Sequence, residues 1–388
     1  MKKILALLLA LLLVAGLAAC GGGNDTPDPT PAPAETEAPE TPDEVEEPEE
    51  GNGFDASDIY IALVAHSPES ILDDGSFNEG AWQGIQRFLG THGLSIDHAE
   101  FFQPHVADDV ARVDMVMDAI SWGANVVVLP GFHFIDSSAE MQEMFPDVHF
   151  VLLDATPAGG PASNLAAIHY AEEQAGFLAG YAAVMEGYRS LGFMGGHAVP
   201  AVVRFGHGFL QGAEHAAESL ELDEDEVTVN YFYVGGFAPS PEVATTASAW
   251  FAGGTEVIFA AAGGAGFSVI SGAEASGGSV IGVDVDQSGA SAVVITSAMK
   301  ALDVSVYDML TDVLNGAFRG GVELMFDASV NGIGLPMATS RFQTFTQAQY
   351  DAIFALLANG SIVVNNVVTP TVSEANLDLP LITVVELN

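Results

Sequence analysis

The feature that most constrains the fold is an alternation of short apolar runs with segments of helical length along most of the 388-residue chain. The apolar runs are rich in Val, Ile and Phe, and the segments between them are amphipathic. Strand and helix segments that alternate in this way predict parallel sheets with helices on both faces, the α/β class. We expect strands at 59–65, 95–102, 125–129, 149–154, 165–170, 191–195, 227–234, 257–262, 280–283 and 293–297, and helices at 78–89, 107–122, 172–186, 200–218, 241–251, 301–314 and 346–357.

The length of the apolar-patterned body predicts two lobes. From Phe54 onward it has about 335 residues, more than a single hydrophobic core usually holds. Ten strands are also too many for one comfortable sheet, and a tail that returns to both sheets would leave crossover strands as a hinge. We expect one lobe at 54–168 and 293–320 and the other at 169–292 and 321–388. Ligands of such sheets bind at the carboxyl ends of the strands, where several glycine-rich loops stand here.

The first 53 residues predict export and anchoring. Lys2 and Lys3 precede an apolar run that is too short for a membrane span, and the run closes on Cys20, the single cysteine of the chain. We expect a lipoprotein signal peptide at 1–19, a lipid on Cys20 that anchors the protein on the extracytoplasmic face of the cell membrane, and a disordered acidic, Pro-rich linker at 20–53.

The charge balance argues against a nucleic-acid partner. The formal net charge is -43, from 52 acidic and nine basic residues. Such a body repels nucleic acid, so we expect no nucleic-acid partner. We interpret the acidity as a solvated surface suited to a saline habitat, because salt screens self-repulsion.

Motifs in register over nearly the whole body resemble the basic membrane protein family. They are IALV at 61–64, DDGSFN at 73–78, AWQG at 81–84, FPDVHF at 145–150, GFLAG at 176–180, GFMGG at 192–196, RF at 204–205, AGGAG at 262–266, GVDVDQ at 282–287 and TSAMK at 296–300. The resemblance implies the type I periplasmic-binding fold, with two Rossmann-like lobes joined by a multi-strand hinge. It also implies a monomeric lipoprotein receptor for a small molecule, with purine nucleosides favoured, that works with the permease and ATPase of an ABC importer.

Two aromatic residues are candidates to stack on a nucleoside base. The resemblance places Phe77 where the family stacks an aromatic ring on the base, and base stacking contributes about 1–3 kcal/mol. Phe237 follows a strand on a Gly-Gly turn and is our candidate for the opposite face, although ordinary packing under the loop is the alternative. Gly263, in the run of glycines after another strand, would let the backbone approach a ligand.

Charged and polar residues at strand ends are candidates to bind the ribose. Asp284 and Asp286 stand two apart, so we expect both carboxylates to face the same side, where they could accept the hydroxyl hydrogens of a diol. A calcium loop at 284–295 lacks the Glu that its twelfth position requires, so we expect no metal. Lys300, the one lysine outside the signal peptide, matches a ligand-contacting family position, as does Asp154. Asp74 and Asn78 complete the predicted site, with a plain helix cap as the alternative for Asn78.

Other functions remain open at this point. A sugar or another small metabolite could bind the same fold, and a ligand sensor that feeds a signalling partner would have the same sequence features. We find no nucleophile elbow, metal cluster or dinucleotide fingerprint, and we therefore expect no enzyme and no cofactor. His66 and His133 stand near the predicted cleft without a role that the family supplies, and either could change the specificity.

Overall fold

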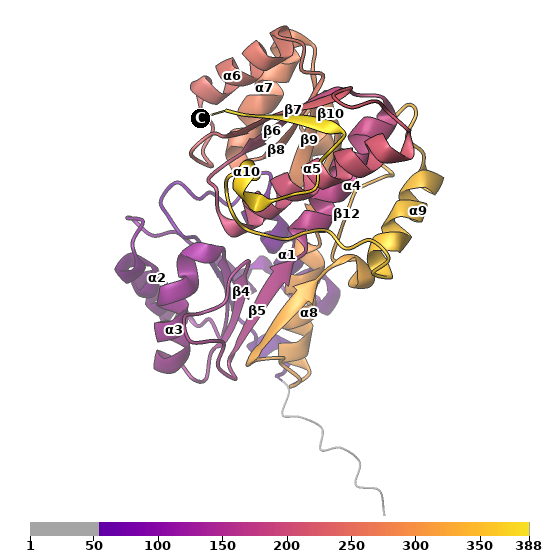
Figure 1. Cartoon of the computed structure of the whole chain (residues 1–388). Coiled ribbons are helices and arrows are strands. Elements are labelled where there is room, and N and C mark those ends of the chain that lie inside the picture. The colour runs from indigo at the N-terminus through magenta and orange to yellow at the C-terminus, as the bar shows by residue number, and fades with distance from the viewer. Residues whose placement is uncertain (1–53, 388) are drawn as a thin grey trace, which may run out of the picture. The chain divides into compact units, whose positions relative to one another are not determined.

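The computed structural model describes residues 54–387, which form two α/β lobes (Figure 1). The sheet of the first lobe has the order β11-β5-β4-β3-β1-β2, and all of its pairings are parallel. Its elements are β1 (Ile61–Val64), β2 (Ala99–Phe102), β3 (Val126–Pro130), β4 (His149–Leu153), β5 (Leu165–Tyr170) and β11 (Val322–Phe326), with the helices α1 (Phe77–His92), α2 (Asp109–Trp122), α3 (Ile135–Met144) and α8 (Leu302–Leu314).

The sheet of the second lobe has the order β12-β10-β9-β8-β6-β7-β13, in which only the pairing of β12 with β10 is antiparallel. Its strands are β6 (Ser190–Gly195), β7 (Val227–Tyr233), β8 (Val257–Ala261), β9 (Ser279–Asp284), β10 (Val294–Lys300), β12 (Ile333–Gly334) and β13 (Ile382–Glu386). Its helices are α4 (Glu172–Glu186), α5 (Pro200–Ser219), α6 (Pro241–Ala252), α7 (Gly266–Ser276), α9 (Gln347–Ala358) and α10 (Val372–Ala375).

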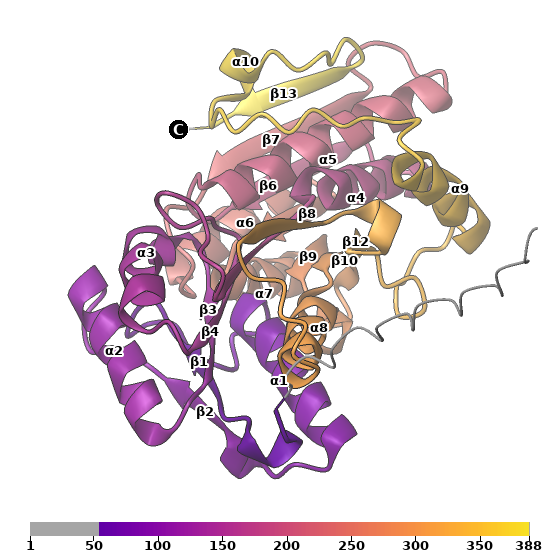
Figure 2. The same cartoon turned by 90° about the horizontal axis from the view of Figure 1, so that it is seen from below.

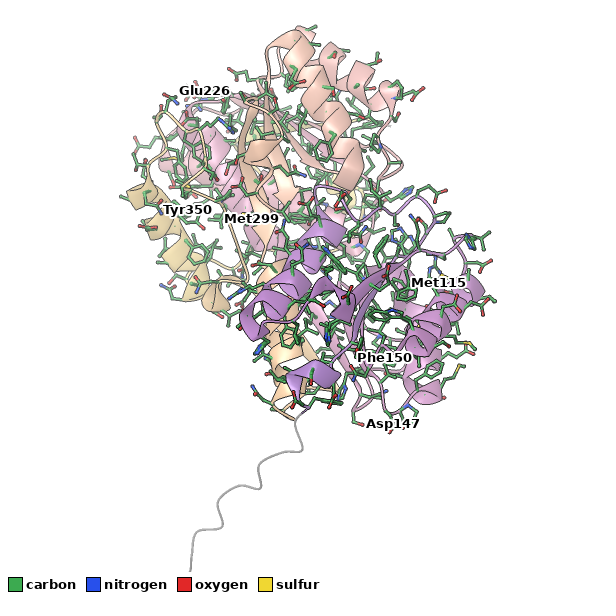
Figure 3. The ribbon with its side chains drawn as sticks, turned by 180° about the vertical axis from the view of Figure 1, so that it is seen from behind. Met115, Asp147, Phe150, Glu226, Met299 and Tyr350 are labelled. Atoms are coloured by element: carbon green, nitrogen blue, oxygen red, sulfur yellow. The ribbon has the colours of Figure 1, made fainter. Side chains whose placement is uncertain are left out.

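Helices cover both faces of each sheet, as the alternation predicts. In the first lobe, α1 and α8 pack on one face and α2 and α3 on the other, and Figure 2 shows β1, β3 and β4 between these pairs. β1 shows why: Ile61 and Leu63 belong to one apolar core, and Ala62 and Val64 to the other. The predicted α/β class is confirmed, and each predicted strand and helix has a counterpart in the structure. The strand expected at 95–102 begins only at Ala99, because Ile96–His98 forms a 3-10 helix, and the helices α3 and α7 were not predicted. Figure 3 shows Phe150 of β4 inside the first lobe and Met299 of β10 where the lobes meet.

The helices α4 and α5 lie in unusually close contact in the second lobe. A Cβ atom on Gly180 would lie 2.0 Å from the carbonyl oxygen of Phe209, and one on Gly212 would lie 1.9 Å from that of Phe177. Glycines spaced by four residues on both helices therefore allow the two backbones to touch. Among residues 54–387, no helix has both the length and the apolar composition that a membrane crossing requires.

The chain crosses between the lobes three times, after β5, after β10 and after β11. Backbone hydrogen bonds join neighbouring crossings, since the N–H of Ala171 donates to the carbonyl of Phe326 (3.2 Å) and that of Ala301 to Gly332 (2.9 Å). These crossings form the predicted multi-strand hinge.

The lobe boundaries differ from those expected from the sequence. β10 was assigned to the first lobe within 293–320, but it pairs with β9 in the second sheet. β11 was assigned to the second lobe within 321–388, but it pairs with β5 in the first. The helix between them, α8, packs on α1 in the first lobe as expected. The sequence could not reveal this exchange because pairing partners far apart in the chain leave no local pattern.

Candidate ligand-binding site

A cavity of about 740 Å³ lies between the lobes, at the carboxyl ends of the strands of both sheets. Loops after β1, β3 and β4, with Arg112 of α2, contribute its wall in the first lobe. Loops after β6, β7 and β8, with the ends of β9 and β10, contribute the wall in the second. Eight of the nine predicted ligand residues line it: Asp74, Phe77, Asn78, Asp154, Phe237, Gly263, Asp284 and Lys300.

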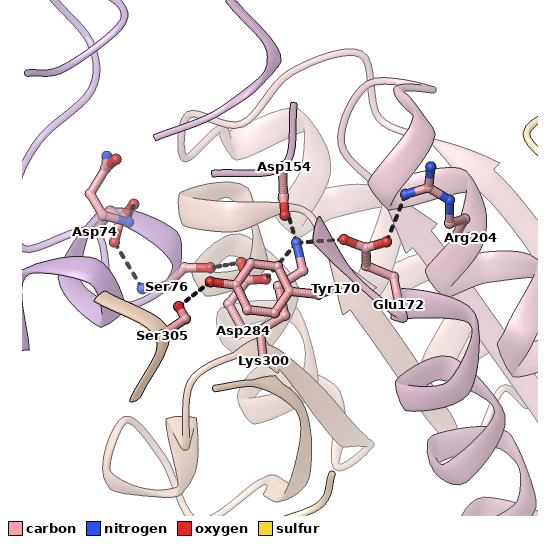
Figure 4. A network of polar contacts seen from close by, with 10 residues as sticks. Asp74, Ser76, Asp154, Tyr170, Glu172, Arg204, Asp284, Lys300 and Ser305 are labelled. Carbon is pink, nitrogen blue, oxygen red and sulfur yellow. Dashed lines mark hydrogen bonds and ion pairs between the residues drawn. The ribbon is translucent and has the colours of Figure 1, made fainter. Parts of the chain in front are cut away.

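Lys300, the last residue of β10, is the centre of the polar network at one end of this cavity (Figure 4). Its Nζ lies 2.5 Å from Oδ2 of Asp154, 3.1 Å from Oε1 of Glu172 and 3.8 Å from Oδ1 of Asp284. The same ammonium lies 4.9 Å from the ring centroid of Phe77. The side chain of Lys300 is 2% exposed, so this charge is almost completely removed from solvent.

Burial and charge set the protonation of the network. Burial alone would lower the pKa of Lys300, but the three carboxylates raise it above its ordinary value. Burial also raises the pKa of Asp154 to about 7 and raises that of Asp284, against the attraction of Lys300. Burial opposes ionisation of Glu172 too, but Lys300 and Arg204 together hold its pKa below the ordinary value. Lys300 therefore stays charged, and the proton that this site can take up belongs to the two aspartates.

The backbone at both aspartates is held in the left-handed region. Asp154 has φ 59° directly after β4, and Asp284 has φ 65° at the end of β9. A non-glycine residue in this region costs about 1–3 kcal/mol and persists only where its surroundings hold it, often at ligand sites. The turn at the end of each strand thus aims both carboxylates, one from each lobe, at the same ammonium.

The loop between β1 and α1 carries Phe77 and the polar residues that fix it. Both carboxylate oxygens of Asp74 accept backbone N–H groups at the start of α1, from Ser76 (2.9 Å), Asn78 (3.0 Å) and Glu79 (3.1 Å). Burial nevertheless raises the pKa of Asp74 to about 6. Asn78 is not the helix cap, because Ser76 occupies the N-cap position and Asn78 instead donates from Nδ2 to the carbonyl of Ile71 (3.1 Å). Asp74 thus performs the capping that the sequence suggested for Asn78.

The wall from the second lobe presents Phe237 and the glycines after β8. Phe237 is half-buried, and its ring meets that of His197 edge to face at 5.4 Å between centroids. A Cβ on Gly196 would lie 2.3 Å from the Phe237 ring, so any side chain at this position would displace that ring. Gly263 has φ +53° and leaves its backbone beside Phe237. The structure therefore brings the two predicted aromatic residues, Phe77 and Phe237, to one cavity from different lobes.

Asp286 is the one predicted ligand residue that the structure does not bring to this cavity. Its carboxylate accepts from Thr339 Oγ1 (2.6 Å) and from the backbone N–H of Ser288 (2.9 Å), and it borders a separate cavity of about 540 Å³. The expectation that Asp284 and Asp286 face the same side was wrong because β9 ends at Asp284. The left-handed φ there breaks the period of two on which the expectation depended.

Five residues of the network were not predicted as ligand contacts. Glu172 begins α4 and Arg204 lies on α5, and their side chains form an ion pair of 2.9 Å. Ser76 donates to Oδ2 of Asp284 (2.6 Å) across the lobes, and Tyr170 forms a 2.5 Å hydrogen bond with Ser305. The only local signal was an acidic residue, Glu172, two positions after the end of the largely apolar β5, which is also typical of an ordinary helix start. Among residues 54–387, no group of His, Cys, Asp and Glu is arranged to hold a metal ion.

Comparison with known proteins agrees with this architecture. The family described as PnrA-like ABC transporter substrate-binding proteins (Bmp) matches residues 61–366. The ABC transporter nucleoside-binding protein BmpA of Lactococcus lactis is 27% identical over 309 residues, which cover 74% of this chain and 84% of that protein. Basic membrane protein B of Borreliella burgdorferi is 29% identical over 300 residues, with 74% and 84% covered.

Solved structures show the same fold. A solute-binding protein of an ABC transporter system from Conexibacter woesei has a TM-score of 0.64 at 25% identity and covers 79% of this chain and 99% of its own. A solute-binding protein from Aeropyrum pernix has a TM-score of 0.63 at 22% identity, with 79% and 88% covered. The match to both lobes identifies the type I periplasmic-binding architecture.

Proposed function

Because this chain belongs to the Bmp family of PnrA-like ABC transporter substrate-binding proteins, we propose that it captures a nucleoside, with purine nucleosides favoured, between its lobes. The observation that carries the proposal is the position of Phe77 beside the Lys300 network in one cavity that both lobes line. A nucleoside needs a flat apolar surface next to paired acceptors and a donor. The relative from Lactococcus lactis, which is described as nucleoside-binding, supports the same ligand class.

In the proposed complex, the ribose lies at the Lys300 end and the base lies on Phe77. The carboxylates of Asp154 and Asp284 accept hydroxyl hydrogens of the diol, and Lys300 donates to a ribose oxygen. Bonds of this kind involve an ionised partner and contribute about 1.5–3 kcal/mol each. Phe237, from the other lobe, covers the opposite face of the base when the lobes close.

Closure of the lobes would couple capture to transport. Ligand that binds residues of both lobes shifts the population toward the closed form by its differential affinity for that form. The permease of an ABC importer would then recognise the closed form and receive the nucleoside. We further propose that a lipid on Cys20, which lies outside the described residues, holds this receptor on the extracytoplasmic face of the membrane.

The neighbouring aspartates provide a matched test. Asp284→Asn removes the charge of a carboxylate at the cavity, whereas Asp286→Asn makes the same change two residues away and outside it. We expect Asp284→Asn to weaken nucleoside binding about tenfold or more, as loss of a charge-assisted bond predicts, and Asp286→Asn to leave it unchanged. Isothermal titration calorimetry with inosine, uridine and ribose would measure this. Binding of ribose or another sugar without any nucleoside would reject the proposed ligand and favour a sugar receptor.

A further inference from the structure

The two ends of the cavity differ in chemistry. The end opposite Lys300 is lined by histidines, and the order of the strands in both sheets leads from one end to the other. In the first lobe, the adjacent strands β4, β3 and β1 lead into Asp154, His133 and His66. In the second lobe, β10 and β9 end in Lys300 and Asp284, whereas β6 leads into His197 beyond β8.

In both sheets, therefore, the order of neighbouring strands leads from the charged end of the cavity to its histidine end. Parallel strands lie about 4.8 Å apart, so two strand spacings place His66 about 10 Å from Asp154 along the sheet edge. The Lys300–Asp154 contact joins the charged ends of the two sheets. At the other end, His197 of the second lobe lies close enough to His133 of the first to contribute to lowering the pKa of His133.

The histidine end is a built polar wall. The rings of His66 and His133 are stacked, with centroids 4.1 Å apart and planes 1° from parallel. Ser70 Oγ lies within hydrogen-bonding distance of the His66 ring (3.0 Å), whereas the His133 ring has no hydrogen-bond partner among the described residues. Burial lowers the pKa of His66 to about 3 and that of His133 to about 4, with Arg112 adding to both effects, so both rings are neutral at neutral pH.

Arg112 supplies the charge of this wall. It is only 6% exposed, on α2, and it borders the cavity. Its Nε donates to the carbonyl of His66 (3.0 Å) and its Nη1 to Oδ1 of Asp109 (2.8 Å), while Nη2 has no partner among residues 54–387. A buried guanidinium with an unused donor, beside an imidazole without a partner, is suited to hydrogen-bond acceptors on a ligand.

The charges around the cavity select among such ligands. Its lining includes five carboxyl groups but only two basic side chains, Arg112 and Lys300, both of which already have acidic partners. A phosphate would therefore meet net repulsion, and a neutral ligand with acceptor atoms at its far edge fits better.

We propose that Arg112 and His133 read the edge of the purine base and make this receptor selective for 6-oxopurine nucleosides, such as inosine and guanosine. This inference rests on the proposed nucleoside function. With the ribose at the Lys300 end, the far edge of the base faces the histidine wall. The acceptors N7 and O6 of a 6-oxopurine match donors from Arg112 and His133, whereas adenine presents an amino group where O6 would be.

Ligands alone provide a first test on the full chain, purified in mild detergent. We expect inosine and guanosine to bind about tenfold or more tightly than adenosine and 7-deazaguanosine, because a good two-point contact discriminates by about 1–3 kcal/mol. Equal affinities for all four nucleosides would overturn the inference and leave the proposed function intact. No binding of any nucleoside would overturn both.

Two substitutions then assign the preference to the wall. Arg112→Lys keeps the charge but loses the planar fork, and should reduce the inosine-to-adenosine preference to about threefold or less. His133→Phe keeps an aromatic ring and should weaken inosine while leaving ribose binding unchanged. Arg87→Lys and His215→Phe make the same changes outside the cavity and should change nothing. A preference for inosine that survives both cavity substitutions would refute the assignment.

Discussion

Replacing Lys300 by Met should destabilise the protein strongly and in a pH-dependent way. The substitution keeps a long side chain but removes the single ammonium among Asp154, Glu172 and Asp284. Breaking a buried ion pair from one side costs about 3–5 kcal/mol, because the remaining charges lack compensation. We expect a loss of this size in the free energy of unfolding above neutral pH.

The pH dependence follows from the aspartates. The folded-state pKa of Asp154 is raised to about 7, so the folded protein binds more protons than the unfolded chain between the ordinary carboxyl pKa and neutrality. Stability therefore falls as pH rises through that window. Without Lys300 the pKa values of Asp154 and Asp284 rise further, and each added unit contributes about 1.4 kcal/mol. The loss in the free energy of unfolding caused by Lys300→Met should therefore be at least about 1.4 kcal/mol larger at about pH 8 than at about pH 5.

Urea denaturation at both pH values would measure the two free energies. Arg319→Met is the matched control, since it also removes one positive charge but from a partly exposed pair with Asp312, where about 0–1 kcal/mol is expected at either pH. Lys300→Met could prove no more destabilising than Arg319→Met, or equally destabilising at both pH values. Either result would contradict the inference that the buried carboxylates depend on Lys300 for charge compensation.

Two further predictions concern packing and charge. Gly180→Ala should destabilise the protein by about 1–3 kcal/mol, because its Cβ would meet the backbone of α5. Gly90→Ala, where a Cβ would have nothing within 4 Å, should instead stabilise α1 by about 0.5–1 kcal/mol. Thermal and urea unfolding would measure both effects, and equal effects would show that the contact between α4 and α5 is unimportant. With a formal net charge of -43, the free energy of unfolding should rise between about 0.1 and 1 M NaCl as the Debye length shortens from about 10 to 3 Å, and a flat salt profile would contradict the role of self-repulsion.

The sequence predicted the fold well because the strands are short, buried and separated by amphipathic helices. Runs such as the fully buried β1 and β8 carry this pattern locally, and each matched its predicted position. The assignment of β10 and β11 to lobes failed because strand pairing is a long-range property. Lys300 illustrates the consequence, since the strand that carries it belongs to the lobe opposite to the one expected.

Much of the candidate site could be predicted because its residues follow strands whose carboxyl ends must meet. Asp154, Asp284 and Lys300 satisfy that rule, and the structure brings them together. Asp286 fails it, because the strand ends two residues earlier. Glu172 was missed because a glutamate that begins a helix is typical of ordinary helix starts, and nothing local distinguishes one that faces a buried lysine.

The position of Lys300 links ligand recognition to the hinge. It is the last residue before the second crossing, and Glu172 follows the first crossing, so both ends of their 3.1 Å contact lie where the lobes join. Its closest partner, Asp154, belongs to the first lobe, whereas Lys300 and Asp284 belong to the second. A ligand group that competes for this ammonium or for either aspartate must therefore change a contact between the lobes. The residues proposed to bind the ribose are thus the residues that sense closure, and a substitution among them should alter affinity and lobe motion together.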